Sequence, residues 1–130
     1  MSARSKKPYE NPRARHAVGR AAEDLAAGYL QRHGCYVLDR RFTCRTGEID
    51  LIVEDDGVLV FVEVKARHGC RYGGALCAVT TRKRRRIVAT ARAFLGQRRW
   101  RGRRCRFDVV GVRLHGGTAE VEWIRDAFRG

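Results

Sequence analysis

Two apolar runs joined by a short acidic turn decide the fold of this chain. Residues 47–67 read GEIDLIVEDDGVLVFVEVKAR, and both sides of the turn are dense in Val, Ile, Leu and Phe. Asp55, Asp56 and Gly57 separate the two runs, and Asp-Gly is a favoured pair for a two-residue hairpin turn. We therefore predict a β-hairpin with strands at about 48–54 and 58–66.

The second strand of this hairpin carries two charges among apolar side chains. Successive residues of a strand point to opposite faces, so Glu63 and Lys65 share the face of Leu59 and Phe61. A strand this apolar is expected in the middle of a sheet, where a charge is unfavourable unless it is paired. These two side chains are therefore the first candidates for a functional site.

The turn also determines which residue of the first strand faces these charges. With residues 56–57 as the turn, counting outward along the antiparallel ladder puts Asp50 opposite Glu63. Directly opposed residues have Cβ atoms about 4.5–5.5 Å apart. Two carboxylates that close repel each other unless a positive charge lies between them, and a divalent cation that prefers oxygen ligands is the simplest candidate. The residues alone leave two hypotheses open, a metal site or a structural salt bridge formed by Asp50, Glu63 and Lys65.

Hydrophobic periodicity on either side of the hairpin predicts the remaining elements. Apolar residues at helical spacing predict one helix at about 17–33 and another from the N-cap Thr80 to about residue 97 or 100. Alternating apolar residues predict three further strands, at 35–42, 106–113 and 119–124. The order αβββαββ predicts an α/β domain with a mixed central sheet flanked by helices.

The length and composition indicate one domain. A chain of 130 residues buries one core and is too short for two. Residues 1–16 are basic and hold almost no aliphatic side chains, which predicts a disordered arm ahead of a single domain at 17–130. The glycines in 67–78 predict a loop. Five scattered cysteines and a charged start without an apolar segment indicate reduced thiols in a cytoplasmic protein.

The charge balance indicates a polyanionic partner. Lys and Arg number 28 against 14 Asp and Glu, a formal net charge of +14, and no long apolar span suggests a membrane. Between residues 82 and 106 there are twelve Arg or Lys and no acid. Contacts to phosphates position a nucleic acid without reading its bases, so we expect little sequence specificity. The residues expected to make these contacts are Arg82, Lys83, Arg84, Arg85, Arg86, Arg98, Arg99, Arg101, Arg103 and Arg104.

Several stretches together resemble a known family. The chain is similar to the YraN-like family of uncharacterised bacterial proteins, which resembles a branch of the PD-(D/E)xK nuclease superfamily with its restriction-endonuclease-like fold. The matching stretches, within residue 17 to the C-terminus, are GEIDLI at 47–52, FVEVKAR at 61–67, GRAAEDLAAGYL at 19–30, Ala78-Val79 and RFDVV at 106–110. One departure is Ile49, which precedes Asp50 where the superfamily motif has proline.

The resemblance implies a role for each residue of the cluster. Asp50 and Glu63 would bind Mg²⁺ or Mn²⁺, with the backbone carbonyl of Val64 as a further ligand. Lys65 would orient or activate the attacking water and stabilise charge at the scissile phosphate. Glu23 in the first helix matches a position that serves as ligand or base in several branches. An acid early in a helix is also favourable without any catalytic role, so both interpretations of Glu23 stay open.

The implied function is that of a Mg²⁺-dependent endonuclease that cleaves branched or single-stranded DNA. Two alternatives use the same residues. A non-catalytic nucleic-acid-binding module would retain the nuclease-like fold and keep its acids for structure, and an RNA-associated basic protein would use the charge alone. The charge and the resemblance favour DNA over RNA without deciding between them. The sequence also does not determine the oligomeric state, including whether the protein is a homodimer.

Overall fold

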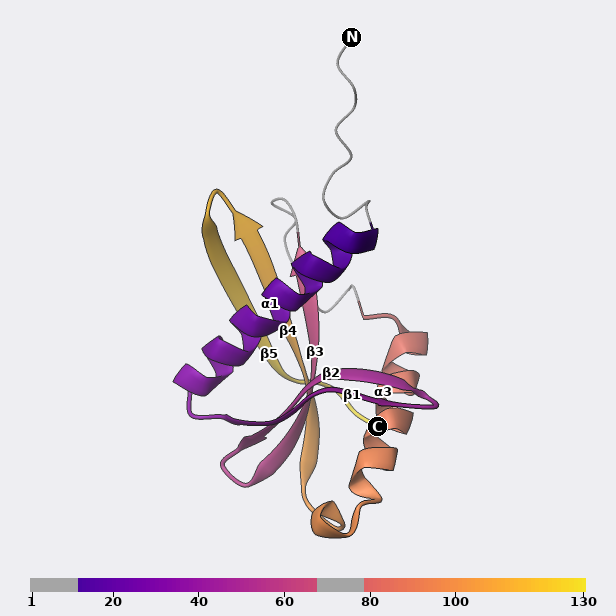
Figure 1. The fold of residues 1–130 in the computed structure, drawn as a ribbon. Helices are drawn as coiled ribbons and strands as arrows, with labels where there is room; N and C mark the ends of the chain where they lie inside the picture. The colour runs from indigo at the N-terminus through magenta and orange to yellow at the C-terminus, as the bar shows by residue number, and fades with distance from the viewer. Residues whose placement is uncertain (1–11, 68–78) are drawn as a thin grey trace.

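The elements of the protein follow the predicted order. The computed structural model describes residues 12–67 and 79–130. The helix–three strands–helix–two strands order confirms the predicted mixed α/β class (Figure 1). The elements are α1 (Pro12–Arg32), β1 (Tyr36–Cys44), β2 (Gly47–Asp55), β3 (Val58–Arg67), α3 (Thr81–Leu95), the short 3₁₀ helix η2 (Arg98–Trp100), β4 (Cys105–His115) and β5 (Thr118–Phe128).

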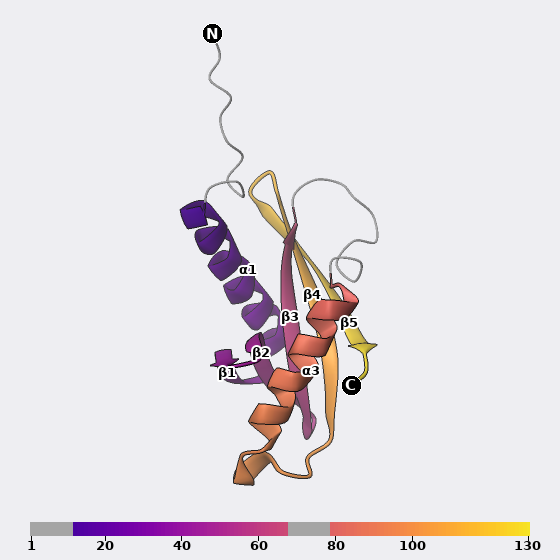
Figure 2. The ribbon, with the colours of Figure 1, turned by 90° about the vertical axis from the view of Figure 1, so that its right-hand side faces the viewer.

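One five-stranded sheet organises the domain. Its strands lie in the order β1-β2-β3-β4-β5, with β3 and β4 parallel and the other pairs antiparallel. Parallel neighbours need a long crossover, and α3 supplies it. Figure 2 shows the sheet between α1 and α3, which cover opposite faces. β3 is therefore enclosed by strands at both edges and by helices on both faces, which explains the apolar run at 58–62.

The side chains of β3 alternate between two hydrophobic cores, as predicted. Val60 and Val62 pack with the alanines and Leu30 of α1. Leu59 and Phe61 pack on the other face with the apolar side of α3. Glu63 continues the second face and is itself buried, so it lies under the N-terminal half of α3 rather than in solvent.

The hairpin has the predicted turn and register. Asp55 pairs with Val58, and the ladder continues without a shift to Leu51 opposite Val62. The same register would next pair Asp50 with Glu63, and regular pairing stops there. The two strands thus separate at the position where the charged side chains lie.

Three predicted boundaries differ from the structure. Helix α1 begins at Pro12, so residues 12–16, which composition assigned to the arm, belong to the helix. Proline fits the first helical turn because the N–H it lacks has no partner there in any case. Helix α3 ends at Leu95 and is followed by η2. Strand β5 extends to Phe128, because a register shift at Phe107/Val109 brings the C-terminal end of β5 onto the hydrophobic core. Residues 1–11 and 68–78, which hold most of the predicted arm and loop, lie outside the described residues.

Within residues 12–67 and 79–130, no helix is long and apolar enough to cross a membrane. The cysteines of this described part, Cys35, Cys44 and Cys105, are free thiols.

Candidate functional site

Asp50 lies where β2 separates from β3. Its Oδ2 accepts a hydrogen bond of 2.8 Å from the backbone N–H of Val64, a residue that pairs with Val110 of β4 and no longer with β2. Burial, followed by the nearby Glu63 carboxylate, raises the pKa of Asp50 to about 8, although the bond from Val64 acts in the opposite direction. Asp50 is therefore protonated at neutral pH when no cation balances the two carboxyl groups.

Glu63 is the buried centre of the site. Its side chain is only 3% exposed, and its Oε1 lies 2.6 Å from the Nζ of Lys83 and 3.5 Å from the Nζ of Lys65. Two ammonium groups thus converge on one carboxylate. A buried carboxylate requires such partners, since an unpaired charge in the interior is strongly unfavourable.

The two lysines have pKa values shifted in opposite directions. Burial lowers the pKa of Lys65, and contact with Lys83 lowers it further. Burial is the largest single effect on Lys83 and disfavours its charge, but the hydrogen bonds to Glu63 and Lys65 together with the nearby carboxylates outweigh burial and raise the pKa of Lys83. Lys83 is therefore the firmly charged partner of Glu63, and Lys65 is the lysine that gives up its proton more readily.

The N-terminus of α3 brings Lys83 to the site. Thr80 caps this helix, because its side-chain oxygen accepts a hydrogen bond of 3.2 Å from the N–H of Lys83. The cap fixes where the helix starts, and the first turn then lies beside Asp50 and Glu63. An open cavity of about 560 Å³ results, lined by Gly47, Glu48, Asp50, Glu63, Thr80, Arg82, Lys83, Arg86 and Ile87.

Glu23 is paired with a residue of β1. Its carboxylate accepts a hydrogen bond of 2.9 Å from Nε of Arg41, and its charge is one of the lesser causes of the raised pKa of Asp50. In the described ranges 12–67 and 79–130, no group of three or more His, Cys, Asp or Glu side chains is arranged to hold a metal ion. The structure brings Asp50, Glu63 and Lys65 together and does not add Glu23 as a third carboxylate.

Some basic side chains of the arginine-rich segment 82–106 are engaged in ion pairs that its sequence does not indicate. Although it holds no acid, acids of β2, β3 and β4 reach three of its twelve basic residues. Lys83 pairs with Glu63, and Arg103 pairs with Glu54 at 2.8 Å. These two were expected to contact phosphate, and the structure places both in ion pairs because α3 and the start of β4 fold back against the hairpin.

Arg106 belongs to a separate buried network that sequence reasoning missed. It bonds Asp55 at 2.7 Å and Asp108 at 3.0 Å. Asp108 is fully buried and also accepts hydrogen bonds from the indole of Trp123 and the backbone N–H of Asp126. The network joins β2, β4 and β5, so its role is structural.

Eight basic residues of the segment remain exposed on α3 and between α3 and β4. Trp100, which lies among them, stacks on Phe94 with ring centroids 5.6 Å apart, so it packs against the core instead of presenting a free ring. The exposed residues are Arg82, Arg85, Arg86, Arg92, Arg98, Arg99, Arg101 and Arg104.

Comparison with known proteins agrees with the resemblance drawn from the motifs. A "UPF0102 protein" of Ralstonia nicotianae is 46% identical over 125 residues, 93% of each chain. Another of Pseudomonas aeruginosa is 45% identical over 113 residues, 85% of this chain and 90% of its own, and one of Nitrosococcus oceani is 42% identical over 119 residues. The profile of the uncharacterised protein family UPF0102 matches residues 22–112, which include Asp50, Glu63, Lys65 and Lys83. The chain therefore belongs to the uncharacterised protein family UPF0102.

Proposed function

We propose that this protein is a Mg²⁺- or Mn²⁺-dependent phosphodiesterase that cleaves nucleic acid, with DNA favoured over RNA. The observation that carries the proposal is the cluster in one open cavity, where Asp50 and Glu63 lie beside Lys65 and Lys83. Carboxylates held close together in a cleft, with shifted pKa values, are more frequent at catalytic sites than at structural ones.

The donor set suits a hard divalent cation. Mg²⁺ in phosphoryl-transfer sites is commonly held by one or two carboxylates, with waters and substrate phosphate completing its shell. Asp50 and Glu63 are such a pair, and the Val64 carbonyl is the further ligand that the resemblance implies. Burial and the Glu63 carboxylate raise the pKa of Asp50, and a bound cation would favour its charged form. A bound cation would polarise the phosphate and lower the pKa of the attacking water.

The lysines supply the protein's own part of the chemistry. With its lowered pKa, Lys65 is suited to take a proton from the attacking water as the oxygen bonds to phosphorus and the P–O bond to the leaving group breaks. Lys83 keeps its charge and would help to neutralise the charge that develops on the phosphate oxygens. Arg82 and Arg86, which line the same cavity, would hold the neighbouring phosphates.

One observation favours a second candidate, a non-catalytic nucleic-acid-binding module. Lys83 lies 2.6 Å from Glu63 and Lys65 lies 3.5 Å from it, so the carboxylate is already balanced without a metal ion. In that case the cluster would stabilise the fold, and the exposed arginines alone would bind phosphates. The two candidates differ in whether any phosphodiester bond is cleaved.

The test is cleavage of a substrate panel with Mg²⁺, Mn²⁺ or EDTA. The panel holds linear duplex, single-stranded and branched DNA together with an RNA of matched length. We expect metal-dependent cleavage that Glu63→Gln abolishes. The matched control is Asp24→Asn, which removes an exposed carboxylate in a surface ion pair with Arg40. No cleavage by the wild type under any metal would leave the binding module as the function.

A further inference from the structure

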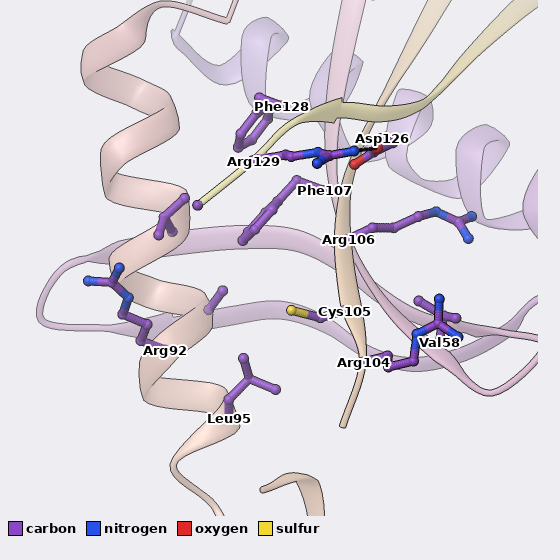
Figure 3. Close-up of a pocket in the computed structure, with 13 residues that line it drawn as sticks. Val58, Arg92, Leu95, Arg104, Cys105, Arg106, Phe107, Asp126, Phe128 and Arg129 are labelled. Carbon is purple, nitrogen blue, oxygen red and sulfur yellow. Dashed lines mark hydrogen bonds and ion pairs between the residues drawn. The ribbon is translucent and has the colours of Figure 1, made fainter. Parts of the chain in front are cut away.

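A large cavity on the α3 side of the sheet has no part in the proposed chemistry. It measures about 630 Å³ and lies between α3, the start of β4 and the end of β5. Figure 3 shows the rings of Phe107 and Phe128, the thiol of Cys105 and the side chain of Leu95 converging in it, whereas Arg106 points to the other side of β4. A cavity of this size with an apolar floor is suited to an organic ring system.

The cavity continues along α3 toward the candidate site. A second hollow of about 590 Å³ shares Val88, Arg92, Phe128 and Arg129 with it and extends to Thr81. Thr81 directly follows Thr80, which lines the cavity of Asp50 and Glu63. The two hollows therefore form one groove, defined here as the α3 groove, which reaches the N-terminal end of α3, whereas the described residues of α3 that line the candidate site lie on another face of the helix.

The rim of the α3 groove is strongly basic. Arg85, Arg92 and Arg104 line it, and among the described residues none of the three has an acidic partner. The acid that lines the groove, Asp126, is engaged by Arg129 at 3.3 Å. The groove thus combines an apolar floor with a positive rim.

We propose that the α3 groove binds a single-stranded segment of nucleic acid, with an unpaired base in the apolar cavity and the neighbouring phosphates on the arginine rim. A single strand alternates flat apolar rings with negative charges, which is the pattern that the floor and rim match. A duplex keeps its bases stacked inside and has no ring to insert. The inference rests on the proposed function, because it takes the partner at the neighbouring site to be nucleic acid.

The groove would give the protein a preference for substrates with an unpaired segment. A strand lying along α3 with a base near Cys105 would continue past Thr81 toward Glu63. Substrates that offer such a strand, such as flaps and branches, would be held by both the groove and the site. Linear duplexes would be held by phosphate contacts alone.

The test measures how much of the affinity depends on bases. Fluorescence anisotropy in EDTA gives Kd for a labelled dT12, for an abasic 12-mer with the same phosphates, and for a 12-bp duplex. We expect the wild type to bind dT12 about tenfold more tightly than the abasic strand, a typical effect for one or two stacked bases. Equal Kd values for the two strands would overturn the proposal.

Cys105→Trp locates this effect in the groove, because the exposed thiol lines the apolar cavity and an indole there would fill it. We expect the variant to lose the difference between dT12 and the abasic strand and to keep its affinity for duplex within about twofold. Cys105→Ala, which leaves the cavity open, is the matched control and should bind like the wild type. A Cys105→Trp protein that retains the full base-dependent difference would refute the location.

A second pair of variants covers the case in which Cys105→Trp does not fold. Arg92→Gln with Arg104→Gln should weaken dT12 binding by about tenfold, whereas Arg98→Gln with Arg101→Gln, on exposed arginines outside the cavity, should weaken it less. Equal losses in both pairs would count against the groove. Because binding is measured without metal, a base-dependent difference in a protein that never cleaves would refute the nuclease and leave the groove. Cleavage by a protein that binds dT12 and the abasic strand equally would support the nuclease and refute the groove.

Discussion

Replacing Lys83 by methionine removes the ammonium that balances the buried carboxylate. At 2.6 Å the Coulomb attraction between Lys83 and Glu63 is about 6 kcal/mol for an effective dielectric constant of about 20. Lys83 is 41% exposed, so solvent screens it, and desolvation of Glu63 offsets much of the rest. Lys65 at 3.5 Å remains as a second partner. We expect a net coupling between Lys83 and Glu63 of about 1–2 kcal/mol.

A double-mutant cycle measures this coupling directly. Urea unfolding in EDTA of the wild type, Lys83→Met, Glu63→Gln and the double variant gives the interaction free energy. The matched control is the Arg40–Asp24 pair, which has a similar separation of 2.7 Å but side chains 46% and 71% exposed. Its coupling should be about 0–0.5 kcal/mol. A Lys83–Glu63 coupling no larger than that of the control would refute the role of Lys83 as the main counter-charge.

Three further predictions concern metal, pH and salt. With its pKa raised to about 8, Asp50 in the folded protein holds a proton that the unfolded chain releases near pH 4. In EDTA the unfolding free energy of the wild type should therefore fall, relative to that of Asp50→Asn, by roughly 2–4 kcal/mol as pH rises from about 4 to 8. Above about pH 8 the difference between the two proteins should change little. A difference that stays constant from about pH 4 to 8 would contradict the prediction. Mg²⁺ should bind more tightly as pH rises through the same range, because its binding displaces the proton from Asp50. Calorimetry in buffers of different ionisation enthalpy measures this proton release. Binding without proton release would argue against Asp50 as a ligand. Replacing Arg82, Arg85 and Arg86 by glutamine should reduce the slope of log affinity against log salt concentration by up to about one unit for each lost phosphate contact. The control Arg40→Gln on β1 should leave this slope unchanged. Equal slopes for the wild type and the triple variant would place the interface elsewhere.

The hairpin and its faces could be predicted because they depend on local rules. An Asp-Gly turn fixes the register from Asp55 opposite Val58, and strand alternation then assigns each side chain of β3 to a face. Glu63 and Lys65 were found in this way before any tertiary contact was known. The N-cap of α3 at Thr80 is equally local, since its side chain bonds a backbone N–H three residues further on.

The partners of these charges could not be predicted, because they come from distant parts of the chain. Lys83 was one of twelve basic residues without an acid nearby in sequence, and nothing in its own helix indicates that it would lie on Glu63. The one signal for the position of Lys83 was the N-cap at Thr80 combined with a parallel crossover from β3. Such a crossover packs the helix back onto the sheet, so the first turn of α3 comes near the end of β3. Asp108 was read only as a position in a strand, whereas its burial depends on partners in β5.

The start of α1 shows a different limit. Composition alone favoured disorder up to residue 16, because basic residues and proline outnumber aliphatic ones there. The helix nevertheless extends back to Pro12, where the absence of an N–H does no harm. Element boundaries depend on such end effects more than the existence of the element does.

The proposed role of Lys65 in phosphodiester cleavage is measured by single-turnover cleavage with Lys65→Ala and with the wild type at saturating Mg²⁺. Lys65 lies in the site but contributes one charge among many, so its loss should change nucleic-acid affinity by less than about twofold. Its loss should lower the cleavage rate about a hundredfold to a thousandfold, as expected for one preorganised group that acts in the transition state. The melting temperature of the same preparation shows whether the variant remains folded. A Lys65→Ala protein that is folded, binds normally and cleaves as fast as the wild type would contradict the account.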